Sequence, residues 1–248
     1  MAHPMTAPQP LLEAVNVRKV YRSGQVSVVA LHELSLTVHA GDLVAVMGPS
    51  GSGKTTLLNC LSGLDDIDAG QVMVGGADLF AMSDADRTEH RARSMGFVFQ
   101  SYNLIPVFTA AENVELPLLL VGTPAGQARR RSLEMLDRVG LAHRAGHRPN
   151  EMSGGEQQRV TVARALVARP AIVWAVEPTG NLDTAMAGQI MALLQRLNAE
   201  DGQTIVLVTH DPAIGAAAGR LVRMRDGRLA ADEAVVPVTA GASAPTLG

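Results

Sequence analysis

The chain has 248 residues with a formal net charge of −3, and 47% of its residues are hydrophobic while 3% are aromatic. This length suffices for one large α/β domain with a sizeable core, or for two small ones. The slightly acidic balance argues against bulk electrostatic binding to nucleic acid, and the single cysteine, Cys60, excludes a disulfide framework and fits a reducing compartment.

Neither the interior nor the ends of the chain have the pattern of a membrane span or a secretory signal. The longest apolar runs, 118–121 and 171–176, are far shorter than the ~20 residues that a spanning helix needs. Residues 1–10 and 236–248 are rich in small residues and proline without an apolar period, so we expect both ends to be flexible. We expect a soluble protein with one domain over residues 11–235.

The first predicted elements are β-strands. Residues 11–21 and 26–38 have β-like patterns and are divided by the turn signal Ser23-Gly24. Residues 43–47 form a continuous apolar run of the kind that a buried parallel strand needs. A glycine-rich loop and an apolar-periodic helix over 54–61 follow this run. The sequence therefore predicts an N-terminal antiparallel β subdomain, followed by a strand, a loop and a helix.

The middle of the chain favours helices, and the α/β alternation returns after Pro149. Helical patterns occur over 84–93, 110–120 and 127–139, and the one strand-like stretch among them is 97–99. The later elements alternate as helices over 154–168 and 184–199 and strands over 171–176, 204–208, 221–225 and 229–231. This order predicts an α/β fold with a mainly parallel sheet and helices on its faces. The helical middle, about 101–168, is then an inserted lobe.

A phosphate-binding loop follows the first buried strand. The pattern G-x-x-x-x-G-K-[ST] is matched by Gly48, Pro49, Ser50, Gly51, Ser52, Gly53, Lys54 and Thr55. The glycines let backbone amides surround the β- and γ-phosphates, because a Cβ would block close approach. Lys54 would place its charge on the terminal phosphates, the Thr55 hydroxyl would hold Mg²⁺, and Thr56 is a further nucleotide-binding candidate. The strand before and the helix after distinguish this motif from a chance turn and predict a P-loop NTPase core.

A second glycine-rich helix start lies at Ser153. Ser153 and Glu156 have the spacing of a capping box, which alone indicates only a well-capped helix. Gly154 and Gly155 follow the cap, and their lack of side chains would leave the helix amides open to an anion. The chain therefore carries two helix starts suited to phosphate.

With these motifs in order, the sequence resembles the ATP-binding cassette (ABC) family over residues 11–230. The signature motif of that family, Leu-Ser-Gly-Gly-Gln or a close variant, matches residues 152–156. The resemblance implies that two cassettes pair head to tail, so that the signature motif of one completes the ATP site at Lys54 of the other. The second cassette would be another copy of this chain or a sister subunit, and the implied ligands are ATP and Mg²⁺.

The resemblance also implies roles for single residues. Tyr21 matches an aromatic residue that stacks on adenine, and an ordinary strand tyrosine is the alternative. Gln100 matches a glutamine that reaches the metal and the attacking water. Residues 180–183, ending at Asp183, resemble the loop that crosses between paired cassettes. His210 matches the switch histidine that contacts the γ-phosphate.

One position departs from the family pattern. The family ends its second core strand with four apolar residues, then Asp, then Glu. Here Glu177 stands at the position of the catalytic base, but Val176 stands at that of the aspartate that helps to hold Mg²⁺. Because successive strand side chains point to opposite sides, Glu177 cannot easily fill both roles. We expect ATP binding to survive, metal affinity to fall by ~10–100-fold, and hydrolysis to fall with it.

The resemblance implies an integral-membrane permease as partner and a peripheral position on the cytoplasmic face of the membrane. The motifs are most similar to the branch that serves lipoprotein release, macrolide or peptide export and cell division. The apolar residues of segment 104–108 either contact the permease or belong to the core. A cassette ATPase acting on nucleic acid is disfavoured by the acidic charge and the single set of motifs, so no nucleic-acid partner is expected. A non-catalytic nucleotide-binding regulator is the remaining alternative, and only Val176 motivates it.

Overall fold

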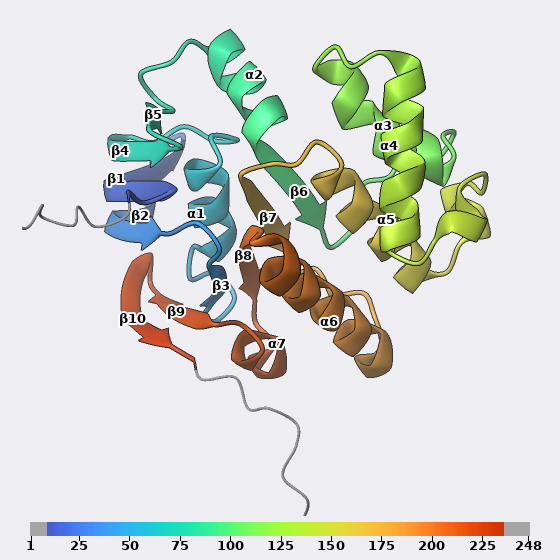
Figure 1. Cartoon of the computed structure of the whole chain (residues 1–248). Coiled ribbons are helices and arrows are strands. Elements are labelled where there is room, and N and C mark those ends of the chain that lie inside the picture. The colour runs from blue at the N-terminus through green and yellow to red at the C-terminus, as the bar shows by residue number, and fades with distance from the viewer. Residues whose placement is uncertain (1–8, 236–248) are drawn as a thin grey trace, which may run out of the picture.

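Two β-sheets and a group of helices make up the fold of residues 9–235, the part of the chain that the computed structural model describes (Figure 1). The expectations for residues 1–8 and 236–248 lie outside the described residues. Over residues 9–235, no helix combines the length and the apolar character that crossing a membrane requires.

The larger sheet has six strands in the order β10-β9-β3-β8-β7-β6. Its strands are β3 (Leu43–Met47), β6 (Met95–Phe99), β7 (Ile172–Val176), β8 (Thr204–Thr209), β9 (Arg220–Arg225) and β10 (Arg228–Ala234). All neighbours pair in parallel except β10, which is antiparallel to β9 at the edge. The three central strands β3, β8 and β7 are buried almost throughout, as their continuous apolar runs predict.

Alternate residues of the central strands face two hydrophobic cores. Val44 and Val46 of β3 share one core with helix α1 (Lys54–Leu61), whereas Ala45 shares the other with Ile190 of helix α6 (Thr184–Asp201). Figure 1 shows α1 and α6 on opposite sides of this sheet. The strands are thereby held from both faces, which fixes the loops at their ends.

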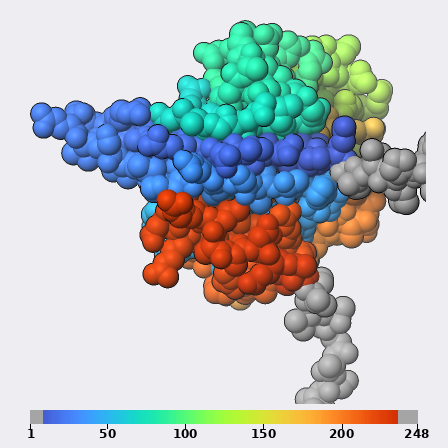
Figure 2. Space-filling view, turned by 90° about the vertical axis from the view of Figure 1, so that its left-hand side faces the viewer, coloured from blue at the N-terminus to red at the C-terminus, as the bar shows by residue number. Residues whose placement is uncertain are grey.

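The second sheet is antiparallel, with the order β2-β1-β4-β5. It contains β1 (Leu12–Ser23), β2 (Val26–Val38), β4 (Ala69–Val74) and β5 (Ala77–Asp78). The predicted antiparallel pairing of β1 and β2 is confirmed, and the tip of this hairpin extends beyond the rest of the molecule at the left of Figure 2. Strands β4 and β5 are absent from the sequence-based prediction. Strand β4 forms because its residues Val72 and Val74 are buried against β1, a pairing between segments far apart in the chain, and β5 pairs with β4.

The helical lobe follows β6. It contains α3 (Ala110–Leu120), α4 (Ala125–Arg138), the short 3₁₀ turns Ala142–Arg144 and Pro149–Glu151, and α5 (Gly154–Leu166). Thr109 and Ser153 begin α3 and α5 with capping boxes, and the second of these boxes was predicted. Residues of α3, α4 and α5 belong to the same core as α6, so the lobe continues the core of the sheet.

Two further helices differ from the prediction in extent or presence. Helix α2 (Asp84–Ser94) matches the predicted segment 84–93, whereas α7 (Pro212–Ala216) was not predicted. Helix α5 ends at Leu166 instead of residue 168, and α6 continues to Asp201. Gly202 ends α6 in the left-handed conformation that glycine adopts at helix C-termini, with φ 64°.

Candidate nucleotide-binding site

A cavity of about 770 Å³ opens at the start of α1. Residues from six separate segments line it: Tyr21, Val28, Val29, Ala30, His32, Ser50, Gly51, Gly53, Lys54, Thr55, Thr56, Glu177, His210, Asp226 and Gly227. The structure thus brings Tyr21, the phosphate-binding loop, Glu177 and His210 together around one space, although they are distant in the sequence. Gly48 and Pro49 line an adjoining cavity that also contains Ser50 and His210.

Glycine is required at two positions of the loop between β3 and α1. Gly53 has φ 95°, and a Cβ there would lie 2.6 Å from the carbonyl oxygen of Ala30. A Cβ on Gly48 would collide with the carbonyl oxygen of Met224 in β9. The loop therefore lies directly against the backbone of neighbouring strands, which leaves no room for side chains at these positions.

The loop and helix α1 present unsatisfied polar groups. Gly53, the residue before α1, provides no side-chain cap, and the first turn contains no acidic residue. The Oγ atom of Ser52 is buried and has no hydrogen-bond partner among the described residues. Unpaired donors at a helix N-terminus are the groups that a phosphate satisfies. The residues present therefore fit a polyphosphate.

Lys54 folds back onto the loop. Its buried Nζ atom donates hydrogen bonds to the carbonyl oxygens of Gly48 at 2.8 Å and Pro49 at 2.9 Å. These two bonds hold the ammonium group inside the loop. A phosphate bound there would be a stronger partner for it, because hydrogen bonds between oppositely charged groups are stronger than those to neutral carbonyls.

Glu177 is held in a strained conformation between two side chains. It follows the end of β7, has φ 45°, and its amide donates to the carbonyl oxygen of Val208 at 2.8 Å. Its Oε1 atom lies 2.8 Å from Nδ1 of His210, and its Oε2 atom accepts a hydrogen bond from Thr209 at 3.2 Å. Because Glu177 has left the extended conformation, the alternation argument based on a continuing strand does not hold at this residue. Its carboxylate instead takes its position from Thr209 and His210.

Val176 is the last residue of β7 and offers no ligand atom. It pairs in register with Phe99 on one side and Val208 on the other, and its half-buried side chain packs against the core that includes α1. Within the described range 9–235, no group of three or more His, Cys, Asp and Glu side chains is arranged to hold a metal ion. Thr55 is the predicted metal ligand that lies in the cavity wall.

Gln100 does not line the cavity. Its Nε2 atom donates to Oδ1 of Asn181 at 3.1 Å, and Nδ2 of Asn181 donates to the carbonyl oxygen of Gln100 at 2.9 Å. Gly180 lies directly against this side chain, since a Cβ there would be 2.8 Å from Nε2. The structure therefore links Gln100 to the segment 180–183.

The second glycine-rich helix start lies outside the cavity wall. Ser153 accepts a hydrogen bond from the amide of Glu156 at 3.3 Å, and Oε2 of Glu156 accepts one from the amide of Ser153 at 2.8 Å. Oε1 of Glu156 accepts a further bond from Arg144 at 2.9 Å, and these bonds lower the pKa of Glu156. The capping box therefore stabilises this helix start without any ligand.

Packing gives a second reason for the two glycines of this motif. A Cβ on Gly155 would collide with the methyl group of Met186, and one on Gly154 would lie 2.8 Å from the hydroxyl of Tyr102. Asp183 accepts a hydrogen bond from the amide of Met186 at 2.8 Å and so begins α6. The sequence suggested that the glycines only expose amides, whereas they also admit side chains from two neighbouring segments.

Sequence motifs missed part of the cavity wall. His32, Asp226 and Gly227 lie in it because the β9–β10 turn contacts the loop: the amide of Gly227 donates to the carbonyl oxygen of Ser52 at 3.1 Å, and the amide of His32 donates to that of Gly227 at 2.9 Å. The predicted strands over 221–225 and 229–231 leave Asp226-Gly227 as the connection between them. Nothing in the sequence indicated which loop the turn would contact.

Comparison with known proteins identifies close relatives. Residues 31–180 match the family model described as ABC transporter. The chain is 46% identical over 222 residues to the lipoprotein-releasing system ATP-binding protein LolD of Geobacter metallireducens, covering 90% of this chain and 99% of that protein. It is 44% identical to the macrolide export ATP-binding/permease protein MacB of Rhodospirillum rubrum, covering 91% of this chain and 34% of that protein. A solved dimeric structure of the ATP-binding cassette MJ0796, in a post-hydrolysis state bound to ADP and Pi, superposes with a TM-score of 0.83, at 41% identity and with 91% of this chain and 99% of that chain covered.

Proposed function

The chain belongs to the ABC transporter family as an ATP-binding subunit, and from this premise we propose that it binds ATP with Mg²⁺ between two cassettes and couples their closure to a membrane permease. The observation that carries the proposal is the placement of the two glycine-rich helix starts. Lys54 lies in the cavity wall, whereas residues 153–155 do not. A second cassette would supply its own signature motif to this cavity. The relative MJ0796 was solved as a dimer, which supports this arrangement.

The residues of the cavity have distinct roles in this proposal. Tyr21 would contact the adenine ring of ATP, and the loop amides with Lys54 would hold its phosphates. Glu177 would take the proton of the attacking water as general base, and His210 would hold the carboxylate in place and contact the γ-phosphate. These functions require the water to lie within hydrogen-bond reach of Glu177.

Mg²⁺, when bound, would neutralise charge on the phosphate oxygens, and Thr55 is its candidate ligand in the cavity wall. Gln100 would reach the metal only after its side chain releases Asn181. Val176 removes a carboxylate from this set, and loss of a metal-supporting group typically lowers metal affinity by ~10–100-fold. We therefore propose that the chain binds ATP and hydrolyses it slowly. Val176 also favours a second candidate function, a non-catalytic nucleotide-binding regulator.

The proposed membrane partner contacts the segment that follows Gln100. Buried Asn113 fixes this segment, because its side chain accepts a hydrogen bond from the amide of Ile105 at 2.7 Å and donates to the carbonyl oxygens of Ile105, Phe108 and Thr109. Leu104 packs against the core, while Val107 is 68% exposed. The segment is thus a fixed loop with an apolar residue facing outward, and such a surface suits a protein partner.

We place the protein at the cytoplasmic face of the membrane, bound to its permease in an export or extrusion system for lipids, peptides or drugs. The relatives named for lipoprotein release and macrolide export support this assignment. The permease would select the cargo.

The dimer proposal is tested by the mass of the purified chain in solution with and without ATP, measured by light scattering after gel filtration. The expected result is a monomer without nucleotide and a dimer with ATP, with the Lys54→Ala variant remaining monomeric. A chain that stays monomeric with saturating ATP, while it binds the nucleotide, would overturn a homodimeric clamp and leave a sister subunit as the required partner.

A further inference from the structure

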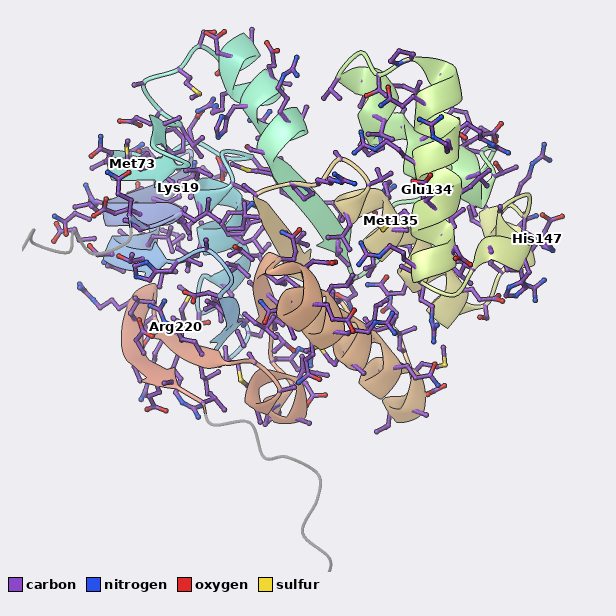
Figure 3. The ribbon with its side chains drawn as sticks, viewed as in Figure 1. Lys19, Met73, Glu134, Met135, His147 and Arg220 are labelled. Carbon is purple, nitrogen blue, oxygen red and sulfur yellow. The ribbon has the colours of Figure 1, made fainter. Side chains whose placement is uncertain are left out.

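Three acidic residues in the segment after α1, Asp65, Asp66 and Asp68, accept hydrogen bonds from the end of β1. The amide of Val20 and the Nη1 atom of Arg22 donate to the carboxylate of Asp68 at 2.7 and 3.0 Å. Lys19 donates through Nζ to the carbonyl oxygen of Asp66 at 2.7 Å. Figure 3 shows Lys19 beside β1, where the antiparallel sheet adjoins α1.

Asp65 holds two side chains of β1 at once. Its Oδ1 atom accepts a hydrogen bond from Nζ of Lys19 at 2.6 Å, and its Oδ2 atom accepts one from the hydroxyl of Tyr21 at 2.7 Å. Nζ of Lys19 also lies 5.1 Å from the centre of the Tyr21 ring, within the range of a cation–π interaction. Both oxygens of Asp65 are therefore engaged, and the Tyr21 ring is held at its hydroxyl and at its face.

Burial and charge support this arrangement. Lys19 is buried, with 9% of its surface exposed, so its ammonium group depends on these partners. Burial alone would raise the pKa of Asp65, but hydrogen bonds from Lys19 and Tyr21 hold it below its usual value. Burial and the bond to Asp65 raise the pKa of the Tyr21 hydroxyl, which keeps it protonated and able to donate.

The segment that contains Asp65 is hydrogen-bonded to α1, the helix that begins at the phosphate-binding loop. The amides of Leu64 and Asp65 donate to the carbonyl oxygen of Asn59 in α1 at 2.8 and 3.1 Å. Helix α1 begins at Lys54, so one rigid unit carries both the phosphate-binding lysine and the carboxylate that holds Tyr21. The spacing between Tyr21 and Lys54 across the cavity is thereby set through Asp65.

We infer that Asp65, with Lys19, is a positioning residue that fixes Tyr21 as the base-contacting wall of the cavity at a set distance from the phosphate-binding loop. The inference rests on the proposed ATP-binding function. Tyr21 is 44% exposed and lies where β1 pairs with β2 but no longer with β4, so the contacts of its side chain with Asp65 and Lys19 help to fix its ring. Because the ring is already ordered before binding, less side-chain conformational entropy is lost when the nucleotide binds.

The test compares binding of ATP and of inorganic tripolyphosphate, which has the phosphates but no base, by isothermal titration calorimetry. Asp65→Ala is expected to weaken ATP binding about fivefold, the effect of having to order one side chain on binding, while tripolyphosphate binding stays within about twofold of the native chain. Tyr21→Phe, which keeps the ring and loses only the hydroxyl, should act in the same direction. The double variant should lose little beyond either single one, because both remove the same bond.

Asp68→Ala is the matched control. It removes a carboxylate from the same loop that also bonds β1, and the hydrogen bonds of this carboxylate go to Val20 and Arg22 instead of the Tyr21 hydroxyl. Equal losses of ATP affinity in Asp65→Ala and Asp68→Ala, or equal losses for ATP and tripolyphosphate in Tyr21→Phe, would overturn the inference. A native chain that binds neither ligand would instead refute the proposed function.

Discussion

The Nδ1 atom of His210 lies 2.8 Å from Oε1 of Glu177, and the second oxygen of this carboxylate accepts a hydrogen bond from Thr209. Glu177 is mostly buried, with 17% of its side chain exposed, while the His210 side chain is 70% exposed. The carboxylate is thus fixed from the side of β8 and reaches the cavity beside an imidazole that solvent or a ligand can contact. This arrangement suits a general base whose position is set before the substrate binds.

Replacing Glu177 should separate binding from hydrolysis. In a Val176→Asp background, we expect Glu177→Gln to lower ATP turnover by at least ~100-fold, the typical contribution of a general base, with ATP affinity nearly unchanged. Release of phosphate and binding of a fluorescent ATP analogue measure the two quantities. Thr209→Val removes the weaker partner of the carboxylate and serves as a control, with an expected loss of less than tenfold. Turnover that persists in Glu177→Gln would show that another group acts as the base.

Lys54 should govern nucleotide affinity more than folding. Lys54→Ala removes the charge from the loop, and we expect ATP affinity to fall by at least ~10-fold, because a charged hydrogen bond contributes ~1.5–3 kcal/mol. At one ATP concentration, the melting temperature of the native chain should rise more than that of Lys54→Ala, since the stabilisation grows with the ratio of ligand concentration to Kd. An equal ATP-dependent rise in both proteins would contradict the assignment of Lys54 to the phosphates.

The contact between Gly155 and Met186 makes a prediction about stability. Gly155→Ala adds a methyl group where the Met186 side chain lies, and overpacking of this kind costs ~1–3 kcal/mol of unfolding free energy. Met186→Ala removes the obstructing group, so the double variant should be more stable than the sum of the two single changes predicts. Urea unfolding of the four proteins measures this coupling, and strictly additive effects would exclude the contact.

Cys60 should report on unfolding and on alkaline instability. Burial is the main cause that raises the pKa of the Cys60 thiol to about 12, and the negative charge of Asp65 is the second cause. Native protein should therefore react with a thiol reagent at pH 8 only as fast as it opens, and unfolded protein should react at once. Because the unfolded thiol ionises near pH 8.5–9 and the folded one does not, the unfolded chain binds fewer protons above that pH, and the contribution of Cys60 to stability falls as pH rises from about 9 towards 12. Cys60→Ser should weaken this alkaline loss, and fast labelling of the native thiol would contradict its burial.

Local patterns predicted the elements that local interactions specify. The apolar runs of β3 and β7, the loop before Lys54 and the capping box at Ser153 are all visible in short windows, and the structure contains each of them. Strand β4 and helix α7 were missed because they are short and depend on distant partners. The Asp211-Pro212 pair that begins α7 was a usable signal, since Asp211 accepts a hydrogen bond from the amide of Ala213.

The composition of the cavity was predictable only in part. Motif order indicated that Lys54, Glu177 and His210 serve one site, and the structure brings them together. The left-handed φ of Glu177, the bond between Tyr21 and Asp65, and the contact of Asp226-Gly227 with the loop depend on contacts between segments far apart in the chain. No spacing rule in the sequence contains that information.

Slow hydrolysis caused by Val176 is tested most directly by the ATPase rates of the native chain and Val176→Asp, measured side by side across Mg²⁺ concentrations. Val176→Asn is the matched control, with the shape of Asp and no charge, and Val176→Asp/Glu177→Gln shows that the rate arises at this site. We predict a rate at least ~10-fold higher for Val176→Asp and a half-saturating Mg²⁺ concentration ~10–100-fold lower than that of the native chain. Equal and rapid hydrolysis by the two proteins, with the same Mg²⁺ requirement, would contradict the account.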